Sequence, residues 1–147
     1  FDSFFAPELF SSAKKMILSE LKSGYFENLG NGKFAFKPFA PVAQLGPIYG
    51  IQLLDANKDG FMDALVAGNS NTDHFLYGNA DASKGLLMLN DGNGNISYKT
   101  FEESGFKANK FARGLVKARI GGQDYYIVPN NNDSAQIFKF NAEKLLN

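Results

Sequence analysis

The sequence has no cysteine, no tryptophan and a single histidine, His74. The absence of cysteine excludes disulfides, thiolate zinc sites and cysteine nucleophiles. The 15 basic and 15 acidic residues cancel, so no charge excess points to nucleic acid or an anionic membrane. No apolar run approaches the roughly 20 residues that cross a bilayer. We therefore expect neither nucleic-acid binding nor membrane insertion.

Aromatic residues and glycine are plentiful instead. Fifteen Phe, six Tyr and 15 Gly in 147 residues favour a single domain with a packed, β-rich core. The chain begins with Phe1 rather than Met, which suggests that it starts inside a longer protein or after a cleavage.

The first 23 residues have a helical pattern. Pro7 suits a first helical turn, and apolar residues from Leu9 to Leu21 recur at three- and four-residue spacing. From Gly24 onward, short apolar runs alternate with Gly, Asn and Asp clusters, which indicates strands and turns. The Asn31-Gly32 and Asn93-Gly94 pairs predict two tight hairpins. The sequence thus predicts a short N-terminal helix followed by an all-β fold.

An internal repeat organises the β region. "NLGNGKF" (28–34) aligns with "NDGNGNI" (90–96) at a period of 62 residues, and residues 49–69 align with 113–131. Four short strands per unit at a fixed period are typical of β-propeller blades. We divide the single domain into a helical lead-in (1–23), a first repeat (24–83) and a second repeat (84–147). Two blades cannot close a ring, so we expect a partial propeller completed by further repeats or another chain. A single β-sandwich with two similar hairpins is the alternative.

The stretch "DANKDGFMD" (55–63) crowds oxygen side chains into one loop. Asp55, Asn57, Asp59 and Asp63 occupy positions 1, 3, 5 and 9 of a ligand pattern, and the carbonyl of Phe61 is available at position 7. Hard oxygen donors at this spacing surround Ca²⁺, whereas Mg²⁺ demands stricter octahedral geometry. These five residues are therefore the predicted calcium site. The alternative is an ordinary Asp, Asn and Gly turn.

The predicted calcium loop differs from an EF-hand loop and from the aligned segment of the second repeat. An EF-hand loop needs a Glu at position 12, which is Val66 here, and it needs flanking helices rather than apolar strands. The aligned segment 118–126 of the second repeat retains one Asp, so we expect no metal there. Its Gly121-Gly122 pair predicts a plain turn.

Signals for catalysis are weak. His74 lies in a polar linker without a nucleophile-elbow pattern, so we predict no catalytic residues and no organic cofactor. Phe34, Phe36, Phe39 and Tyr49 could form a sugar-stacking platform, although core packing is their commoner role. A carbohydrate-binding module and, less favoured, a hydrolase fragment using His74 are the alternative functions.

Nearly the whole chain resembles a known family. "DANKDGFMDALVAGN", "DASKGLLMLNDGNGN" and "ESGF" are similar to the FG-GAP/VCBS repeats of integrin α-chain propellers and of large ASPIC/UnbV-type proteins, at their C-terminal end. The resemblance implies a calcium-bearing propeller segment in a secreted, cell-surface or bacterial envelope protein, with no catalytic activity. It places the metal ligands on Asp55, Asn57, Asp59, Phe61 and Asp63. The implied role is an interaction or adhesion scaffold that contacts the remaining propeller, another protein or a glycan.

Overall fold

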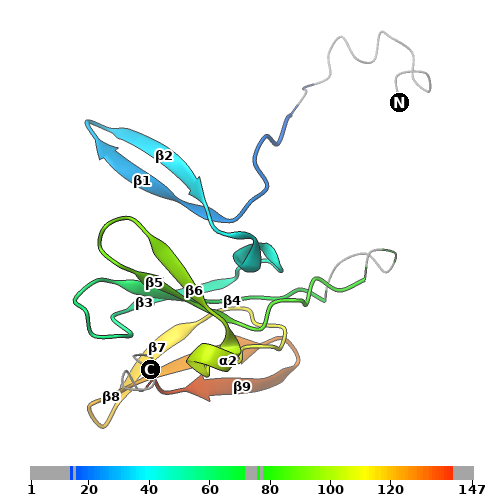
Figure 1. Ribbon diagram of the computed structural model, residues 1–147. Helices are drawn as coiled ribbons and strands as arrows, with labels where there is room; N and C mark the ends of the chain where they lie inside the picture. The colour runs from blue at the N-terminus through cyan, green and yellow to red at the C-terminus, as the bar shows by residue number, and fades with distance from the viewer. Residues whose placement is uncertain (1–13, 15, 72–75, 77, 141–147) are drawn as a thin grey trace.

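A computed structural model describes residue 14 and residues 16–71, 76 and 78–140 (Figure 1). The described part is built almost entirely of antiparallel strands, so the all-β prediction is confirmed. The strands are β1 (Gly24–Gly30), β2 (Lys33–Pro38), β3 (Gly50–Leu54), β4 (Asp63–Ala67), β5 (Leu86–Asn90), β6 (Ile96–Lys99), β7 (Val116–Ile120), β8 (Gln123–Asn130) and β9 (Asp133–Phe138). Two single helical turns interrupt them: the 3₁₀ turn η1 (Pro41–Gln44) and α2 (Phe101–Ser104).

The predicted N-terminal helix is wrong for the residues that are described. Lys14 and residues 16–23 have no helical structure, and residues 1–13 and 15 lie outside the described part. The described residues of the apolar stripe find no partner surface, because Met16, Ile17 and Leu21 are each at least 74% exposed. A short helix without tertiary packing is marginal in water.

The strands form three sheets that follow one another as layers (Figure 1). The β1–β2 hairpin comes first, the four-stranded sheet β3-β4-β5-β6 lies in the middle, and β7-β8-β9 forms the last layer. The middle sheet takes its strands from both predicted repeats, two from residues 50–67 and two from residues 86–99. The described residues thus contain one complete four-stranded sheet between two smaller ones, and they do not form a closed propeller ring.

Residues with positive φ form the tight turns that connect paired strands. Asn31 and Gly32 both have positive φ (52° and 72°) and join β1 to β2 in a two-residue turn, as predicted. Gly121 and Gly122 do the same between β7 and β8, which confirms the plain turn predicted there. Asn93-Gly94 differs, since it lies within a longer loop, 91–95, between the paired residues Asn90 and Ile96.

The main core fills the space between the middle sheet and β7-β8-β9. Leu65 and Leu87 from the middle sheet meet Tyr126 and Val128 from β8, and all four are at least 96% buried. Phe106, from the segment after α2, is fully buried among them, with its ring 4.7 Å from that of Phe138. Apolar burial on this scale holds the two layers together.

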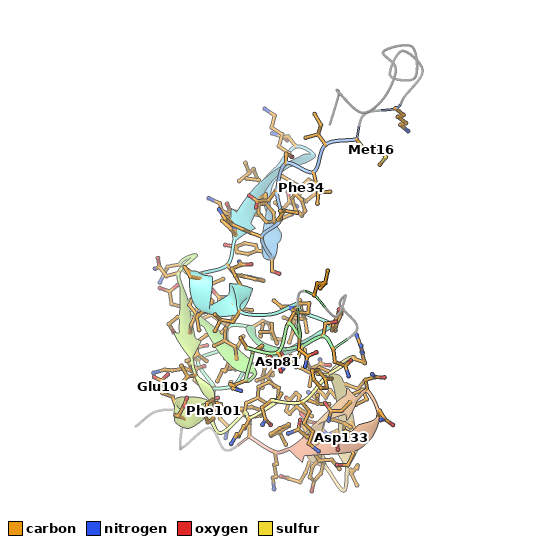
Figure 2. The ribbon with its side chains drawn as sticks, turned by 90° about the vertical axis from the view of Figure 1, so that its right-hand side faces the viewer. Met16, Phe34, Asp81, Phe101, Glu103 and Asp133 are labelled. Carbon is orange, nitrogen blue, oxygen red and sulfur yellow. The ribbon has the colours of Figure 1, made fainter. Side chains whose placement is uncertain are left out.

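The hairpin is attached on the opposite face of the middle sheet. Residues of η1 and its flanks, including Phe39 and Ala43, pack on Val66 and Met88. The Tyr25 ring stacks on that of Phe39 at 6.0 Å. The rest of the hairpin extends away, and Figure 2 shows Phe34 far from the two larger sheets.

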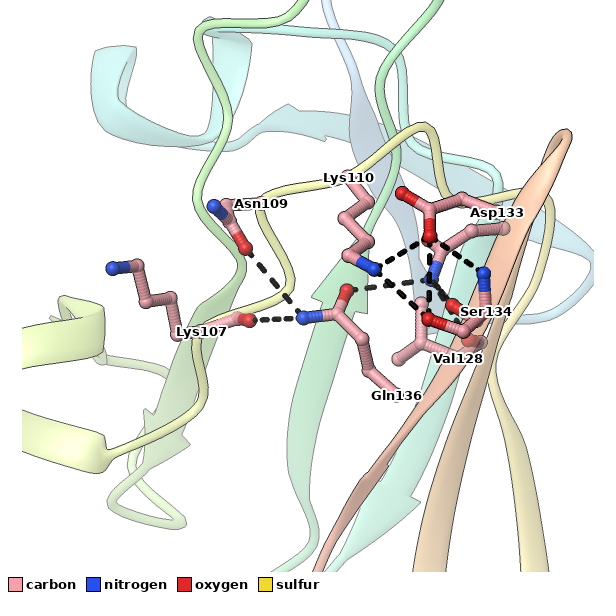
Figure 3. Close-up of polar contacts among 8 residues, drawn as sticks. Lys107, Asn109, Lys110, Val128, Asp133, Ser134 and Gln136 are labelled. Atoms are coloured by element: carbon pink, nitrogen blue, oxygen red, sulfur yellow. Dashed lines mark hydrogen bonds and ion pairs between the residues drawn. The ribbon is translucent and has the colours of Figure 1, made fainter.

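A polar network fastens the segment before β7 to the last strand (Figure 3). The Lys110 ammonium lies 2.7 Å from a carboxylate oxygen of Asp133 and donates to the Ser134 hydroxyl at 3.1 Å. The Gln136 amide donates to the carbonyl of Lys107 at 2.9 Å. The hydrogen bond from Lys110 is the main cause of a lowered pKa at Asp133. These contacts secure the segment around the buried residues Phe106 and Ala108.

A candidate cation-binding loop and its neighbours

The oxygen-rich loop connects β3 to β4. The last backbone pair of these strands, Leu54 with Asp63, closes its base. Within the loop, Lys58 and Gly60 adopt positive φ, at 63° and 91°. Such values are easy for Gly but uncommon for Lys, so the loop holds Lys58 in a tight, specific bend.

Three of the predicted ligands turn into the loop. The carboxylate of Asp55 accepts hydrogen bonds from the backbone amides of Asp59 and Gly60, both at 3.1 Å. The Asn57 side chain accepts from the Asp59 amide at 3.2 Å and donates to the Asp59 carboxylate at 2.7 Å. The other oxygen of Asp59 accepts from the Phe61 amide at 2.8 Å. The structure therefore brings Asp55, Asn57 and Asp59 together.

Asp63 is held differently. It is 1% exposed, and its two carboxylate oxygens accept hydrogen bonds from the backbone amides of Ala56, at 2.8 Å, and Asn90, at 2.9 Å. A buried carboxylate needs such partners to offset its desolvation. Asp63 thus joins the start of the loop to the end of β5. The Phe61 ring lies against Gly92 of the next loop, which leaves no room for a Cβ there.

The donor set suits a hard cation, but its carboxylates are not gathered into one cluster. A carboxylate oxygen that accepts one amide hydrogen keeps a second lone pair, and oxygen donors are what Ca²⁺ prefers. In the described part of the chain, however, no three Asp, Glu, His or Cys side chains lie close enough together to hold a metal ion. The structure shows Asp55, Asn57 and Asp59 joined by hydrogen bonds within the loop, with Asp63 bonded beside them.

A second loop of the same kind escaped the sequence prediction. Asp91, Asn93 and Asn95 alternate with glycines between β5 and β6, in the order D-x-N-x-N, which parallels the D-x-N-x-D of residues 55–59. The Asp91 carboxylate accepts from the amides of Asn93 and Asn95, at 2.8 and 3.1 Å. Its main hydrogen bond, from the Asn95 side chain, lowers the pKa of Asp91. The alternation was the available signal, although the Asn-Gly pair suggested only a hairpin turn.

The two loops lie side by side. They line one pocket of about 200 Å³ whose polar side chains include Asn57, Asp59, Asp91, Asn95 and Ser97. Phe61 against Gly92 and Asp63 bonded to Asn90 hold the two loops together. This end of the middle sheet therefore presents a continuous surface of oxygen and amide groups.

The corresponding segment of the second repeat has a different chemistry. Asp124, its one acid, lies 2.8 Å from the Lys117 ammonium and 3.7 Å from Arg119 Nε. The hydrogen bond from Lys117 is the main cause of a lowered pKa at Asp124. This carboxylate balances basic side chains of β7.

The residues of the alternative functions are dispersed. His74 lies outside the described residues. The ring of Phe36 packs against Phe26, that of Phe39 against Tyr25, and that of Tyr49 under the Arg113 guanidinium at 5.2 Å. Three of the four aromatic residues of the suggested sugar platform therefore have separate partners, and Phe34 is 61% exposed on the hairpin. None of the helices in the described part is long and apolar enough to cross a membrane.

Comparison with known proteins adds no relative. No protein-family model matches the chain, and neither the search of curated proteins nor the search of solved structures returned a match.

Proposed function

We propose that the chain is a non-enzymatic, calcium-binding segment of a β-propeller that serves as an interaction or adhesion scaffold. The observation that carries this proposal is the 55–63 loop, in which Asp55, Asn57 and Asp59 turn inward between two antiparallel strands. An ordinary turn needs one such side chain, whereas three in alternation suit an ion.

Calcium would be held by Asp55, Asn57, Asp59, Asp63 and the carbonyl of Phe61. When bound, the ion would neutralise the repulsion between these carboxylates. Asp63 already joins the loop to β5 through Asn90, so order in the loop extends to the centre of the four-stranded sheet. Because the three carboxylates are not clustered beforehand, we expect binding to tighten the loop and to stabilise the fold.

The arrangement of the sheets supports a propeller segment. One four-stranded sheet packs against β7-β8-β9 on one face and is partly covered by η1 on the other, and the sheets beside it have two and three strands. Four strands are the size of a blade. The FG-GAP/VCBS resemblance fits this arrangement, with the β1–β2 hairpin as the end of one blade and β7-β8-β9 as the start of another. The remaining blades would come from further repeats or from another chain.

A secreted or cell-surface location follows from the proposed ion. A loop with this donor set belongs to the weak, extracellular class of sites, with Kd of about 10⁻⁴ to 10⁻³ M. Such a site fills where calcium is abundant.

Thermal unfolding with and without a calcium chelator tests the proposal. We expect millimolar calcium to raise Tm by several degrees and the chelator to abolish the increase. The Asp59→Ala variant should show no calcium effect, whereas Asp81→Asn, an exposed acid outside both loops, should respond like the wild type. Identical wild-type melting curves with calcium and with chelator would overturn the assignment.

A further inference from the structure

An apolar groove of about 420 Å³ lies between the β1–β2 hairpin and the middle sheet. Tyr25 and Phe39 line it on the side of the hairpin, and Ile51, Leu53 and Met62 line it on the side of the sheet. The last three side chains are each more than half exposed, so they are accessible to a partner. Contiguous exposed apolar surface of this kind usually marks an interaction site.

The polar side chains of the groove already have partners. The Glu27 carboxylate lies 3.5 Å from the Lys37 ammonium. The Asn90 side-chain amide donates to the Met62 carbonyl at 3.4 Å. An unpaired charge would be costly to bury against the remaining apolar lining. The groove therefore suits apolar side chains.

A second unpartnered apolar surface joins the fold at the rim of this groove. It is the N-terminal segment (16–22), in which Met16, Ile17 and Leu21 are at least 74% exposed. The segment ends at Ser23, whose amide donates to Gln44 Oε1 at 2.8 Å and whose carbonyl accepts from the Phe39 amide at 3.0 Å. The next residue, Gly24, lines the groove. The segment is thus anchored beside the surface that lacks a cover.

The N-terminal segment is long enough to lie along the groove. An extended chain spans about 3.4 Å per residue, so Leu21 reaches about 10 Å from Gly24 and Ile17 about 24 Å. The five residues of β3 span about 17 Å. A short tether also gives an effective concentration of about 1 mM. Contact within one chain is therefore favoured over contact between two copies at micromolar concentration.

We propose that the N-terminal segment folds back over this groove and covers Ile51, Leu53 and Met62 with its apolar side chains. Each surface then removes the other from water, which is the main favourable contribution to such packing. The groove is open in the structure, and Figure 2 shows Met16 far from the two larger sheets. The covered form is a second arrangement of the same chain. The inference goes beyond the proposed calcium site, because the segment and β3 lie outside the 55–63 loop.

A single tryptophan in the groove tests the proposal. The sequence has none, so Leu53→Trp gives the full chain one fluorescent reporter, and Ile51→Trp on the same face gives a second. With chelator present, we expect short-wavelength emission, as from an indole shielded from water, and weak quenching by iodide.

Substitutions in the segment then distinguish its contribution. Adding Ile17→Asp/Leu21→Asp to the reporter should move the emission to longer wavelength and strengthen the quenching, because carboxylates are not buried in an apolar groove without partners. The control Ser19→Asp/Lys22→Asn changes the net charge equally at exposed positions of the same segment. It should leave the emission and the quenching unchanged.

Emission typical of an indole in water, with the segment intact, would overturn the proposal. The same emission in both double variants would also overturn it. Short-wavelength emission that is lost on dilution would identify a second copy as the cover and would overturn it too. Circular dichroism verifies that each variant folds. Because chelator is present throughout, the result does not depend on the calcium proposal.

Discussion

At the residue scale, Asp63 determines how the loop is attached to the sheet. Its two oxygens satisfy the backbone amides of Ala56 and Asn90 in a buried setting. An acceptor in this position serves the fold with or without an ion, because both amides would otherwise be unpaired. Asp63 is therefore both a predicted ligand and a structural residue.

We expect Asp63→Ala to lower the free energy of unfolding by about 2 to 4 kcal/mol, since two buried donors lose their acceptor. Urea unfolding in the presence of chelator measures this loss free of any contribution from calcium. Asp81→Ala, at an exposed position, should change stability by no more than about 0.5 kcal/mol. A loss at Asp63 no larger than at Asp81 would show that these hydrogen bonds are unimportant.

Two salt-bridged acids, Asp124 and Asp133, should make the folded protein less stable as the pH falls. Hydrogen bonds from Lys117 and Lys110 lower the folded-state pKa of Asp124 and Asp133 from the ordinary value of 3.8. A depressed pKa adds stability that is present above the unfolded value and is lost as pH falls through the folded value. The double variant Asp124→Asn/Asp133→Asn should therefore lose less Tm than the wild type between pH 5 and pH 2. Parallel profiles for the two proteins would contradict this expectation.

At the element scale, local chemistry predicted the strands and two of the turns. Asn31-Gly32 and Gly121-Gly122 form the expected two-residue turns because positive φ is required at both positions. Asn93-Gly94 failed as a simple turn because Asp91 accepts amide hydrogens from farther along the chain and widens the loop. The helical stripe of residues 1–23 failed in its described part because periodicity does not supply a packing partner. The candidate loop was found from its spacing, but the hydrogen bond that the Asn90 amide donates to Asp63 joins residues 27 positions apart, which spacing does not reveal.

Positive φ makes Gly121 a local test of the turn. Its φ is 58°, and a Cβ added at this residue would meet no other atom within 4 Å. We expect Gly121→Ala to lower stability by about 1 kcal/mol through backbone strain alone. The matched variant Gly114→Ala, at a glycine without positive φ and with only ordinary contact to Pro129, should cost less. Chemical denaturation measures the free energy of unfolding of both variants. Equal losses in the two variants would rule out backbone strain as the cause.

At the scale of the whole molecule, the layers depend on the core between the middle sheet and β7-β8-β9. Phe106 is its largest fully buried side chain. Phe106→Ala should cost about 3 to 5 kcal/mol by leaving a cavity between the layers. Phe34→Ala, at an exposed site on the hairpin, should cost far less. Urea unfolding measures the free energy of unfolding of both variants. Similar losses would mean that this core contributes no more to stability than the exposed hairpin site.

The two ends of the layered arrangement are apolar. Val116, Ile127 and Ile137 are directly paired across the outer face of β7-β8-β9, and Phe26 and Phe36 are paired on the hairpin. Val116, Ile137 and Phe26 are each more than half exposed. Contiguous exposed apolar surface usually marks an interaction site, which supports the proposal that further sheets or another chain cover these faces.

A charged substitution on the outer face of β7-β8-β9 tests whether this face is an interaction surface. Ile137→Lys should reduce binding of the dye ANS and self-association at high concentration, with little change in Tm, because the side chain is 64% exposed. Ala135→Lys, at an exposed position of the same strand, adds the same charge as a control. A large fall in Tm for Ile137→Lys alone would show that this face is already packed.

A crystal structure determined from calcium-containing solution would show whether a calcium ion occupies the 55–63 loop. We expect an anomalous density peak with oxygen ligands from Asp55, Asn57, Asp59, Asp63 and the Phe61 carbonyl at roughly 2.3 to 2.6 Å. A water molecule or the Lys58 ammonium in that place, with no anomalous signal, would contradict it.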